Sequence, residues 1–468
     1  MPHECYNRPI HKAGNNLTYF FETYGCQMNH AESSSMEQLL LKTGWAAAAD
    51  AEHCDLLIIN TCSVRITAET RVLGRLGHFS GLKKKRNFFV LLIGCMAERL
   101  YDEIQKQFPL VDYVVGMFER NLLPKIFDEI KMRVKDGSYL SEFMGKTIDE
   151  KPVSGYHFAE ISHSPHAFQS YVPIMNGCNN FCTYCIVPYV RGREVSRPVS
   201  EILHEIDFLA EAGVREITLL GQNVNSYHGI YEDGSPVDFP DLLSLIAKKA
   251  AEKDSIRWIR FMASHPKDMS DKLIEVIAAE SRICKLVHLP VQHGSNKILK
   301  RMNRVYTVEH YKNRIKKLKE TIPNFALSTD ILIGFPGETE EDVQLTLDLM
   351  KEMEFDAAFM YHYNPREGTR AYDFPDRIEE SVKIERLGRV IDLQLKITAK
   401  KMRQRLGKKI PVLVESHSRN NEDELFGHSE LGEMTVIEGN PPESLIGNFA
   451  FVELKELKGK TFRARLIP

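Results

Sequence analysis

The amino-acid sequence predicts an α/β protein built from three parts. The N-terminal part, 17–140, is predicted to hold a doubly wound parallel sheet, because apolar, β-prone runs alternate there with helical stretches. The same alternation with a longer period predicts a central, partial (βα)6 barrel at 165–400. Short strands separated by turns predict a small C-terminal β-barrel at 402–468.

The bulk composition indicates a soluble protein of several domains. Its 468 residues, 43% hydrophobic and 27% charged, are ordinary for globular chains with full cores. No apolar run approaches the roughly 18 residues of a membrane-spanning helix, and the first sixteen residues lack the apolar core of a signal peptide. We therefore expect a cytoplasmic monomer without membrane contact. The net charge of −3 argues against a uniformly basic nucleic-acid coat, although local patches can still bind RNA.

Three cysteines of the N-terminal part each end a predicted strand. Cys26 closes "LTYFFETYGC", Cys62 closes "DLLIINTC" and Cys95 closes "FFVLLIGC". Because the carboxyl ends of parallel strands lie along one edge of a sheet, we expect these thiols to converge. The alternative is three independent buried thiols, since free cysteine is among the most buried residue types. Cys54 starts its strand and Cys5 lies in the N-terminal tail, so neither is predicted to be a ligand.

Polar and glycine-rich sequences follow the strands of the predicted barrel. The strand-like runs are "YVPIMNG", "EITLLGQN", "RWIRFMAS", "KLVHLPVQ", "ALSTDILIGF" and "AAFMYHYNP". The sequences at or after their ends are "NGCNNFCTYC", "GQN", "SHP", "QHG", "GFPGE" and "YNPREGT". Active sites of βα barrels lie on the face formed by the carboxyl ends of the strands, so we expect the functional site there.

The central part begins with three cysteines within eight residues: Cys178, Cys182 and Cys185. Soft thiolates at short spacing select zinc or an iron–sulfur cluster. Three thiolates can hold a cubane cluster and leave one iron open, which the spacing favours. Zinc usually takes four ligands and would need another side chain. Three histidines just upstream could provide it: His157, His163 and His166.

The spacing C-x3-C-x2-C, with Tyr184 before the last cysteine, resembles the signature of the radical S-adenosylmethionine superfamily. That resemblance implies that the open iron is chelated by the amino and carboxylate groups of S-adenosylmethionine. It also implies that electron transfer to the bound cofactor generates a 5′-deoxyadenosyl radical.

The resemblance narrows along the chain. "TYGCQMN", "NTCSVR" and "GCMAER" resemble the three cysteine motifs of the methylthiotransferase family, and "RGREVSRP", "GQNVNSY", "LPVQHGS", "STDILIGFPGETEED" and "YNPREGT" resemble its barrel motifs in order. The C-terminal part is similar to the RNA-binding TRAM domain, so the resemblance covers 18–468. The residues after Cys26 and Cys62 resemble the MiaB subfamily. The family often has proline where Glu367 stands in this sequence.

Membership of this family implies two [4Fe–4S] clusters. Cys178, Cys182 and Cys185 would hold the first, and Cys26, Cys62 and Cys95 an auxiliary cluster. The residues implied to contact S-adenosylmethionine are Tyr184, Gly221, Gln222, Asn223, Ser264, Gln292, Gly334 and Glu338.

The MiaB resemblance implies a tRNA substrate. The C2 hydrogen of N6-isopentenyladenosine 37, in the anticodon loop, would be replaced by a methylthio group at the expense of two S-adenosylmethionine molecules. An electron donor such as a flavodoxin or ferredoxin would act with the enzyme. The alternatives are a threonylcarbamoyl-modified adenosine 37, an aspartate of a ribosomal protein, or a non-catalytic RNA-binding protein with structural zinc.

Other polar and aromatic residues have two interpretations each. His265 and His293 are predicted to be satisfied rim histidines rather than metal ligands. Arg191 and Arg193 are predicted to meet RNA phosphate or cofactor. The segment 396–409 carries seven Lys or Arg and no acid, which favours phosphate contact over a merely exposed helix face. The part after it has ten acids and six bases, so its RNA binding would rely on a patch, on shape, or on stacking through rings such as Phe426 or Phe449.

Overall fold

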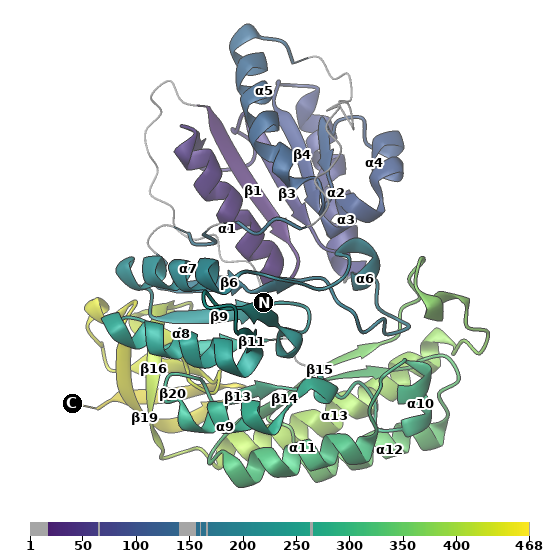
Figure 1. Ribbon diagram of the computed structural model, residues 1–468, viewed down its shortest axis with the longest axis vertical. Helices are drawn as coiled ribbons and strands as arrows, with labels where there is room; N and C mark the ends of the chain where they lie inside the picture. Colours follow the sequence, from purple (N-terminus) through teal and green to yellow (C-terminus); the bar gives the residue numbers. More distant parts are fainter. Residues whose placement is uncertain are drawn as a thin grey trace. The chain divides into compact units, whose positions relative to one another are not determined.

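The computed structural model describes residues 17–63, 66–139, 156–159, 161–164, 167–262 and 265–467. The chain divides into two compact units, one of Met1–Asn179 with Ile186–Arg197 and one of Asn180–Cys185 with Pro198–Pro468 (Figure 1). Each helix in the described part of the chain is too short or too polar to cross a membrane.

The first unit contains a five-stranded parallel sheet in the order β2-β1-β3-β4-β5. The strands are β1 (Thr18–Tyr24), β2 (Ala46–Ala47), β3 (Leu56–Thr61), β4 (Phe89–Gly94) and β5 (Tyr113–Val115). Both central strands, β3 and β4, are buried along their whole length, which their unbroken apolar sequences require.

Helices cover both faces of this sheet. They are α1 (Gln27–Lys42), α2 (Ile66–Lys83), α3 (Cys95–Arg99), α4 (Tyr101–Gln107) and α5 (Leu123–Asp136). One core joins α2, α3 and α4 to one face of the sheet, and a second core joins α1 and α5 to the other. The predicted doubly wound sheet is therefore confirmed. The same unit holds β6 (Gln169–Pro173), a short hairpin of β7 (Met175–Asn176) and β8 (Val195–Ser196), and α6 (Val187–Val190).

The second unit contains the βα alternation of the central part. Its parallel strands are β9 (Glu216–Leu220) with β12 (Trp258–Phe261), and β13 (Leu286–His288) with β14 (Ala326–Ile333) and β15 (Ala357–His362). An isolated parallel bridge between Ile259 and Ile283 links the two sets. Between the strands stand α7 (Val199–Glu211), α8 (Phe239–Lys253), α9 (Asp271–Ala279), α10 (Asn296–Arg301), α11 (Val308–Thr321) and α12 (Glu340–Met353). All six predicted strand runs, including β6, are strands.

A long helix, α13 (Glu380–Arg403), leads into a closed five-stranded barrel. The barrel order is β16-β17-β18-β20-β19, from β16 (Lys409–Ser418), β17 (Asn421–Ser429), β18 (Met434–Glu438), β19 (Phe449–Lys458) and β20 (Thr461–Leu466). Nine buried apolar residues fill its interior. The predicted small β-barrel is confirmed.

The small barrel is fastened to β9 and β12 through His428 of β17. His428 Nε2 lies 2.9 Å from a carboxylate oxygen of Glu216, and its Nδ1 contacts Glu415. Arg260 bonds the same Glu216 at 2.9 Å and donates to the carbonyl of Glu430 at 2.6 Å. This cluster of ion pairs joins two parts of the second unit that the sequence predicts as separate domains.

Phe449 also belongs to this junction. Its ring packs edge-on against Trp258, with centroids 4.7 Å apart. The expectation that Phe449 offers a stacking surface to RNA is therefore corrected, because Trp258 of β12 already packs against that ring.

Candidate metal centres and cofactor pocket

The sheet of the first unit brings Cys26, Cys62 and Cys95 to one edge. They follow β1, β3 and β4, which are adjacent in the sheet, and the strand ends are level because Tyr24 pairs with Thr61 and Thr61 with Gly94. Neighbouring strands lie about 4.8 Å apart, so three level strand ends span only about 10 Å. The predicted convergence of the three thiols is what this register produces.

Two glycines permit the close approach of these strand ends. A Cβ at Gly25 would stand 2.9 Å from the Cβ of Cys62 and 2.2 Å from the side-chain oxygen of Asn29. Gly94 has φ +98°, and a Cβ there would stand 2.3 Å from the carbonyl oxygen of Thr61. Side chains at these positions would push the strand ends apart.

A buried pair of asparagines positions the Cys26 turn. Asn29 accepts hydrogen bonds from the backbone N–H of Cys26 at 3.1 Å and from its thiol at 3.3 Å. Its amide nitrogen donates to Asn60 at 3.0 Å, and Asn60 donates back to the Asn29 carbonyl at 2.8 Å. Both asparagines are fully buried. They lie within the motifs "QMN" and "NTC" beside the cysteines, but the sequence alone does not predict a role for them.

A buried arginine supplies positive charge beside these thiols. Arg191, which follows α6, is only 3% exposed and donates from Nη1 to Glu32 and to Asn176, both at 3.0 Å. The expectation that Arg191 meets RNA phosphate is corrected by this burial. Helix α6 packs against Cys95 through Ile186 and Val190, which brings the guanidinium to the cysteine site.

The electrostatics of the three thiols reflect these neighbours. The hydrogen bond to Cys62 lowers the pKa of Cys26 to about 6, with Arg191 acting in the same direction. Burial raises the pKa of Cys95, and Arg191 opposes that rise. A thiolate buried without a cation would be costly, so the guanidinium makes this edge fit for anionic sulfur.

The second cysteine set lies in the loop between β7 and α6. The last turn of α10 clamps this loop from within the second unit. The N–H of Thr183 donates to the Met302 carbonyl at 3.0 Å, and its hydroxyl to the Arg301 carbonyl at 2.9 Å. Asn303 donates to the carbonyl of Phe181 at 3.0 Å. These bonds fix the backbone around Cys182 and Cys185.

Two buried polar atoms near the ends of β9 and β12 have no partner within the described part of the chain. Asn223 is 1% exposed, and its amide nitrogen donates to Asp268 at 2.7 Å, whereas its oxygen accepts nothing. His265 is 4% exposed, and its Nδ1 accepts from the N–H of Lys267 at 3.3 Å. That bond leaves the proton on Nε2, which has no acceptor. The prediction of a satisfied His265 is therefore wrong.

These two atoms fit a polar ligand. Buried polar groups are almost always hydrogen-bonded, so an orphan acceptor and an orphan donor after neighbouring strands point to a bound molecule. Burial lowers the pKa of His265 to about 2, so the imidazole is neutral and offers a fixed donor. By this observation the two residues fit S-adenosylmethionine, a ligand rich in both donors and acceptors.

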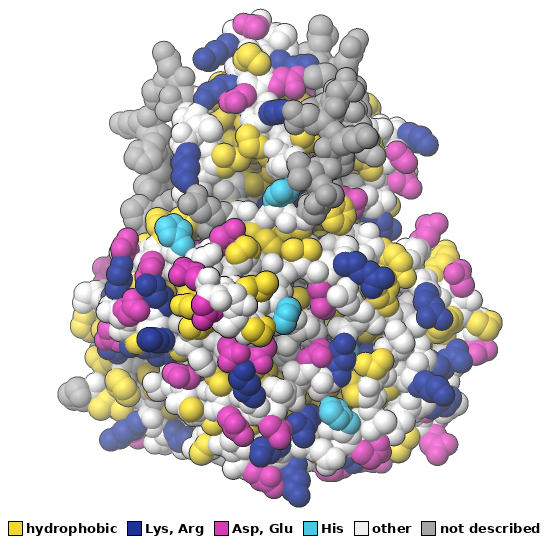
Figure 2. Space-filling model, in the orientation of Figure 1, with side chains coloured by type: hydrophobic (Ala, Val, Ile, Leu, Met, Phe, Trp, Pro, Cys, Tyr) yellow, Lys and Arg dark blue, Asp and Glu magenta, His cyan; other side chains and the backbone are white. Residues whose placement is uncertain are grey.

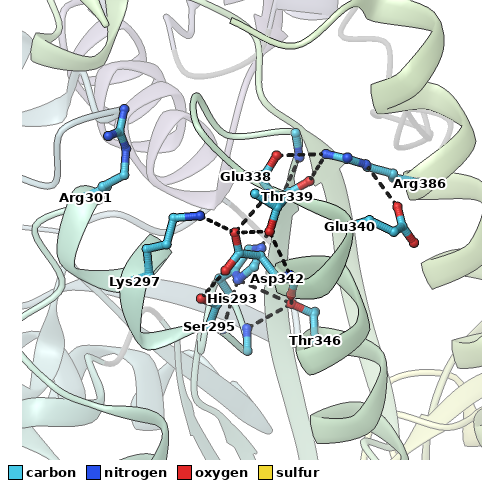
Figure 3. A network of polar contacts seen from close by, with 12 residues as sticks. His293, Ser295, Lys297, Arg301, Glu338, Thr339, Glu340, Asp342, Thr346 and Arg386 are labelled. Atoms are coloured by element: carbon cyan, nitrogen blue, oxygen red, sulfur yellow. Dashed lines mark hydrogen bonds and ion pairs between the residues drawn. The ribbon is translucent and has the colours of Figure 1, made fainter. Parts of the chain in front are cut away.

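Glu338 of "GFPGE" lies in a network of internal contacts (Figure 3). Its carboxylate oxygens accept from His293 Nε2 at 3.0 Å, from the N–H of Gly334 at 2.9 Å and from Arg386 at 3.0 Å, and its side chain is fully buried. His293 also accepts from the N–H of Ser295 at 3.0 Å, so the satisfied histidine expected there is present. Glu338 and Gly334 hold the loop together, and this geometry does not support their direct contact with cofactor.

The other sequence-predicted cofactor contacts lie at strand ends. Gly221 and Gln222 follow β9 and are half-buried, and Gln292 takes a left-handed φ of 68° between β13 and α10. The Tyr184 ring is half-buried against Phe335, with centroids 6.4 Å apart. Three residues weighed in the sequence, Cys5, His166 and Ser264, lie outside the described residues.

No three His, Cys, Asp or Glu side chains in the described ranges stand close enough together to hold a single metal ion. Cys54 precedes β3, whereas Cys62 follows it; Cys54 is fully buried, and its thiol donates to the Ala51 carbonyl at 3.4 Å.

The basic segment 396–409 is partly neutralised inside the second unit. Lys400 pairs with Glu354 at 2.6 Å, Lys401 with Asp356 at 2.7 Å, and Arg405 with Glu433. On the face drawn in Figure 2, Lys and Arg side chains are interspersed with Asp and Glu. The expectation that the whole segment faces RNA is therefore corrected. Its remaining exposed basic residues are Lys396, Arg403, Lys408 and Lys409.

Comparison with known protein families finds three matching regions. Residues 18–116 match the Uncharacterized protein family UPF0004, residues 172–350 match the radical SAM superfamily, and residues 403–467 match the TRAM domain. Together they include both cysteine sets and the small barrel.

Among solved structures, the radical S-adenosylmethionine methyltransferase TsrM from Kitasatospora setae, with cobalamin and a [4Fe–4S] cluster bound, aligns with a TM-score of 0.55. The alignment covers 76% of this chain and 74% of that one at 13% identity. At this identity the likeness concerns the fold alone.

Curated relatives match over nearly the whole chain, and all three described here are named tRNA-2-methylthio-N(6)-dimethylallyladenosine synthase. That of Treponema denticola is 79% identical, covering 96% of this chain and 100% of the relative. Those of Treponema pallidum strain Nichols and Clostridium botulinum strain Langeland are 64% and 42% identical, covering 96% and 95% of this chain and 99% and 95% of the relatives. The chain thus belongs to the tRNA-2-methylthio-N(6)-dimethylallyladenosine synthase family of radical SAM transferases.

Proposed function

We propose that this chain replaces the C2 hydrogen of N6-dimethylallyladenosine 37 in tRNA by a methylthio group, using S-adenosylmethionine and two [4Fe–4S] clusters. The observation that carries the proposal is the additional set of Cys26, Cys62 and Cys95, which follow three level strand ends. A radical enzyme that only abstracts hydrogen needs one cluster, whereas sulfur insertion needs a second, sulfur-bearing centre.

The two cysteine sets divide the work. Cys178, Cys182 and Cys185 would hold the cluster that binds S-adenosylmethionine, and Cys26, Cys62 and Cys95 the auxiliary cluster. When bound, the clusters and S-adenosylmethionine supply hydrogen-atom abstraction and the methylthio group, chemistry that amino-acid side chains do not provide.

The contribution of the polypeptide is to bind, orient and shield these groups. The Asn223 oxygen and the Nε2–H of His265 offer an acceptor and a donor to S-adenosylmethionine, and both are supported by their orphan state. Because His265 is neutral, it would orient the cofactor without adding a second positive charge to the site. Burial of both groups excludes water, which protects a reactive intermediate from side reactions.

Binding of tRNA rests on the TRAM domain and on the end of α13. The exposed residues Lys396, Arg403, Lys408 and Lys409 are the candidates for phosphate contacts, since their neighbours on the segment pair with acids. A tRNA substrate also places the reaction in the cytoplasm. The proposal also includes an external electron donor, a flavodoxin or ferredoxin, and a monomeric enzyme. Its domains are 17–140, 165–400 and 402–468.

The test is anaerobic reconstitution with iron and sulfide, followed by incubation with S-adenosylmethionine, reductant and tRNA carrying N6-dimethylallyladenosine. Mass spectrometry of the digested nucleosides should show 2-methylthio-N6-dimethylallyladenosine, with 5′-deoxyadenosine and S-adenosylhomocysteine as coproducts. tRNA with threonylcarbamoyl-adenosine 37 serves as the control substrate and should remain unmodified. Methylthiolation of the control alone would refute the substrate assignment, and a colourless protein that leaves S-adenosylmethionine intact would refute the whole proposal.

A further inference from the structure

Arg304 holds a buried guanidinium against one of the loop cysteines. Its Nη1 donates to Cys182 Sγ at 3.3 Å, its Nη2 to the Pro290 carbonyl at 3.1 Å, and its Nε to the Tyr306 hydroxyl at 3.1 Å. Tyr306 in turn donates to the Val291 carbonyl at 2.7 Å. All three nitrogens of the Arg304 guanidinium therefore have a hydrogen-bond partner, which fixes the orientation of the side chain.

The backbone after α10 determines this placement. The N–H of Arg304 returns to the Leu299 carbonyl at 2.8 Å, and Asn303 takes a left-handed φ of 57°. The same turn clamps the cysteine loop through Met302 and Asn303. Arg304 is therefore positioned by the very residues that hold Cys182.

The charge of Arg304 has no carboxylate to balance it within the described part of the chain. Its partners are a thiol, a phenol and a carbonyl, all neutral groups when the thiol is protonated. The residue is only 9% exposed. Buried cations normally have an anionic partner, because removing an unpaired charge from water is costly. A cluster held by Cys182 would supply the negative charge that this guanidinium lacks.

We propose that Arg304 is a positioning residue that raises the reduction potential of the cluster held by Cys178, Cys182 and Cys185. Reduction by an external donor adds one electron, and hence one negative charge, to the cluster. A nearby cation and an N–H···S hydrogen bond both stabilise the reduced form, so they make the cluster easier to reduce. This inference rests on the cluster site proposed above.

The experiment uses the reconstituted full-length enzyme with both clusters. Iron and sulfide are quantified, and the reduced clusters are followed by EPR during a redox titration. The signal that changes when S-adenosylmethionine is added reports the loop cluster. The variants are Arg304→Met, which keeps much of the volume without charge, and Arg304→Lys, which keeps the charge without the fork. Arg301→Met is the matched control, because the Arg301 side chain, labelled in Figure 3, bonds the Pro336 carbonyl and Asp376 instead of sulfur.

In Arg304→Met the one-electron equilibrium of the loop cluster should shift at least tenfold toward the oxidised form, a fall of about 59 mV. Arg304→Lys should shift it less, and Arg301→Met should leave it unchanged. A full complement of iron with an unchanged potential in both Arg304 variants would overturn the inference. Loss of the loop cluster in both variants would also overturn it, since Arg304 would then only hold the loop. A wild-type enzyme without a loop cluster would instead refute the proposed function.

Discussion

Replacing His428 by Gln should loosen the small barrel from β9 and β12 at neutral pH and have no such effect at high pH. Burial lowers the pKa of His428, but hydrogen bonds to Glu216 and Glu415 outweigh it and raise the pKa to about 9. Arg260, which faces the same cluster, opposes the rise. The imidazole is therefore charged at neutral pH and bridges two carboxylates.

The size of the effect follows from linkage. A rise of the pKa from about 6.5 in the unfolded chain to about 9 is equivalent to about 3 kcal/mol at roughly 1.4 kcal/mol per pKa unit. Because the folded pKa lies above the unfolded one, this stabilisation is fully present below about pH 6.5. It is lost as pH rises through about 9, where the folded form also loses its proton.

Hydrogen exchange measures this locally, which matters because a chain of several domains does not unfold in one step. Peptides from β17 and β9 should exchange up to roughly 100-fold faster in His428→Gln than in wild type at about pH 6.5, and equally fast in both proteins at about pH 10. His417→Gln, which changes an exposed histidine of the same barrel, is the control and should leave these peptides unchanged. Equal exchange of His428→Gln and wild type at both pH values would refute the reasoning.

The remaining predictions concern the cofactor pocket, the cysteine edge and RNA. His265→Phe should weaken S-adenosylmethionine binding roughly fivefold in equilibrium dialysis, because one hydrogen bond contributes about 1 kcal/mol; an unchanged affinity would remove His265 from the pocket. Gly94→Ala should lower the iron content bound in the first unit, because the new Cβ would stand 2.3 Å from the Thr61 carbonyl oxygen. The control is Gly137→Ala, whose Cβ would have nothing within 4 Å and should leave the iron content unchanged. Equal iron in both variants would show that the close approach at Gly94 is not needed for cluster binding. Neutralising Lys396 and Arg403 together should reduce the salt dependence of tRNA binding by roughly 0.7 to 0.9 per lost phosphate contact, and an unchanged slope would mean that these residues are merely solvated.

The sequence predicts the positions of the cysteines well because their chemistry is local. Cys62 and Cys95 directly follow unbroken apolar runs, and strand-helix alternation is enough to place both thiols at one edge of a parallel sheet. The order of the strands in the sheet, by contrast, cannot be predicted from the local sequence. That the strands before Cys26, Cys62 and Cys95 are immediate neighbours depends on long-range pairing, which no local pattern encodes.

The buried arginines beside the cysteines are also not predictable from the sequence, because their partners lie far away along the chain. Arg191 meets Glu32 across 159 positions, and Arg304 meets Cys182 across 122. A charge in a sequence indicates a solvent-facing or phosphate-binding group, whereas its burial depends on a partner elsewhere in the chain. Lys401 shows the converse, since its basic run pointed to RNA while Asp356 neutralises it.

The proposed mechanism requires a sulfur-bearing centre in the first unit, distinct from the loop cluster. The decisive measurement compares 5′-deoxyadenosine with methylthiolated tRNA from one anaerobic preparation in which Cys26, Cys62 and Cys95 are all replaced by Ala. The loop cysteines and the pocket at Asn223 and His265 remain, so 5′-deoxyadenosine should still form, while no 2-methylthio-N6-dimethylallyladenosine should appear. Methylthiolated tRNA at the wild-type level from this variant would contradict the account.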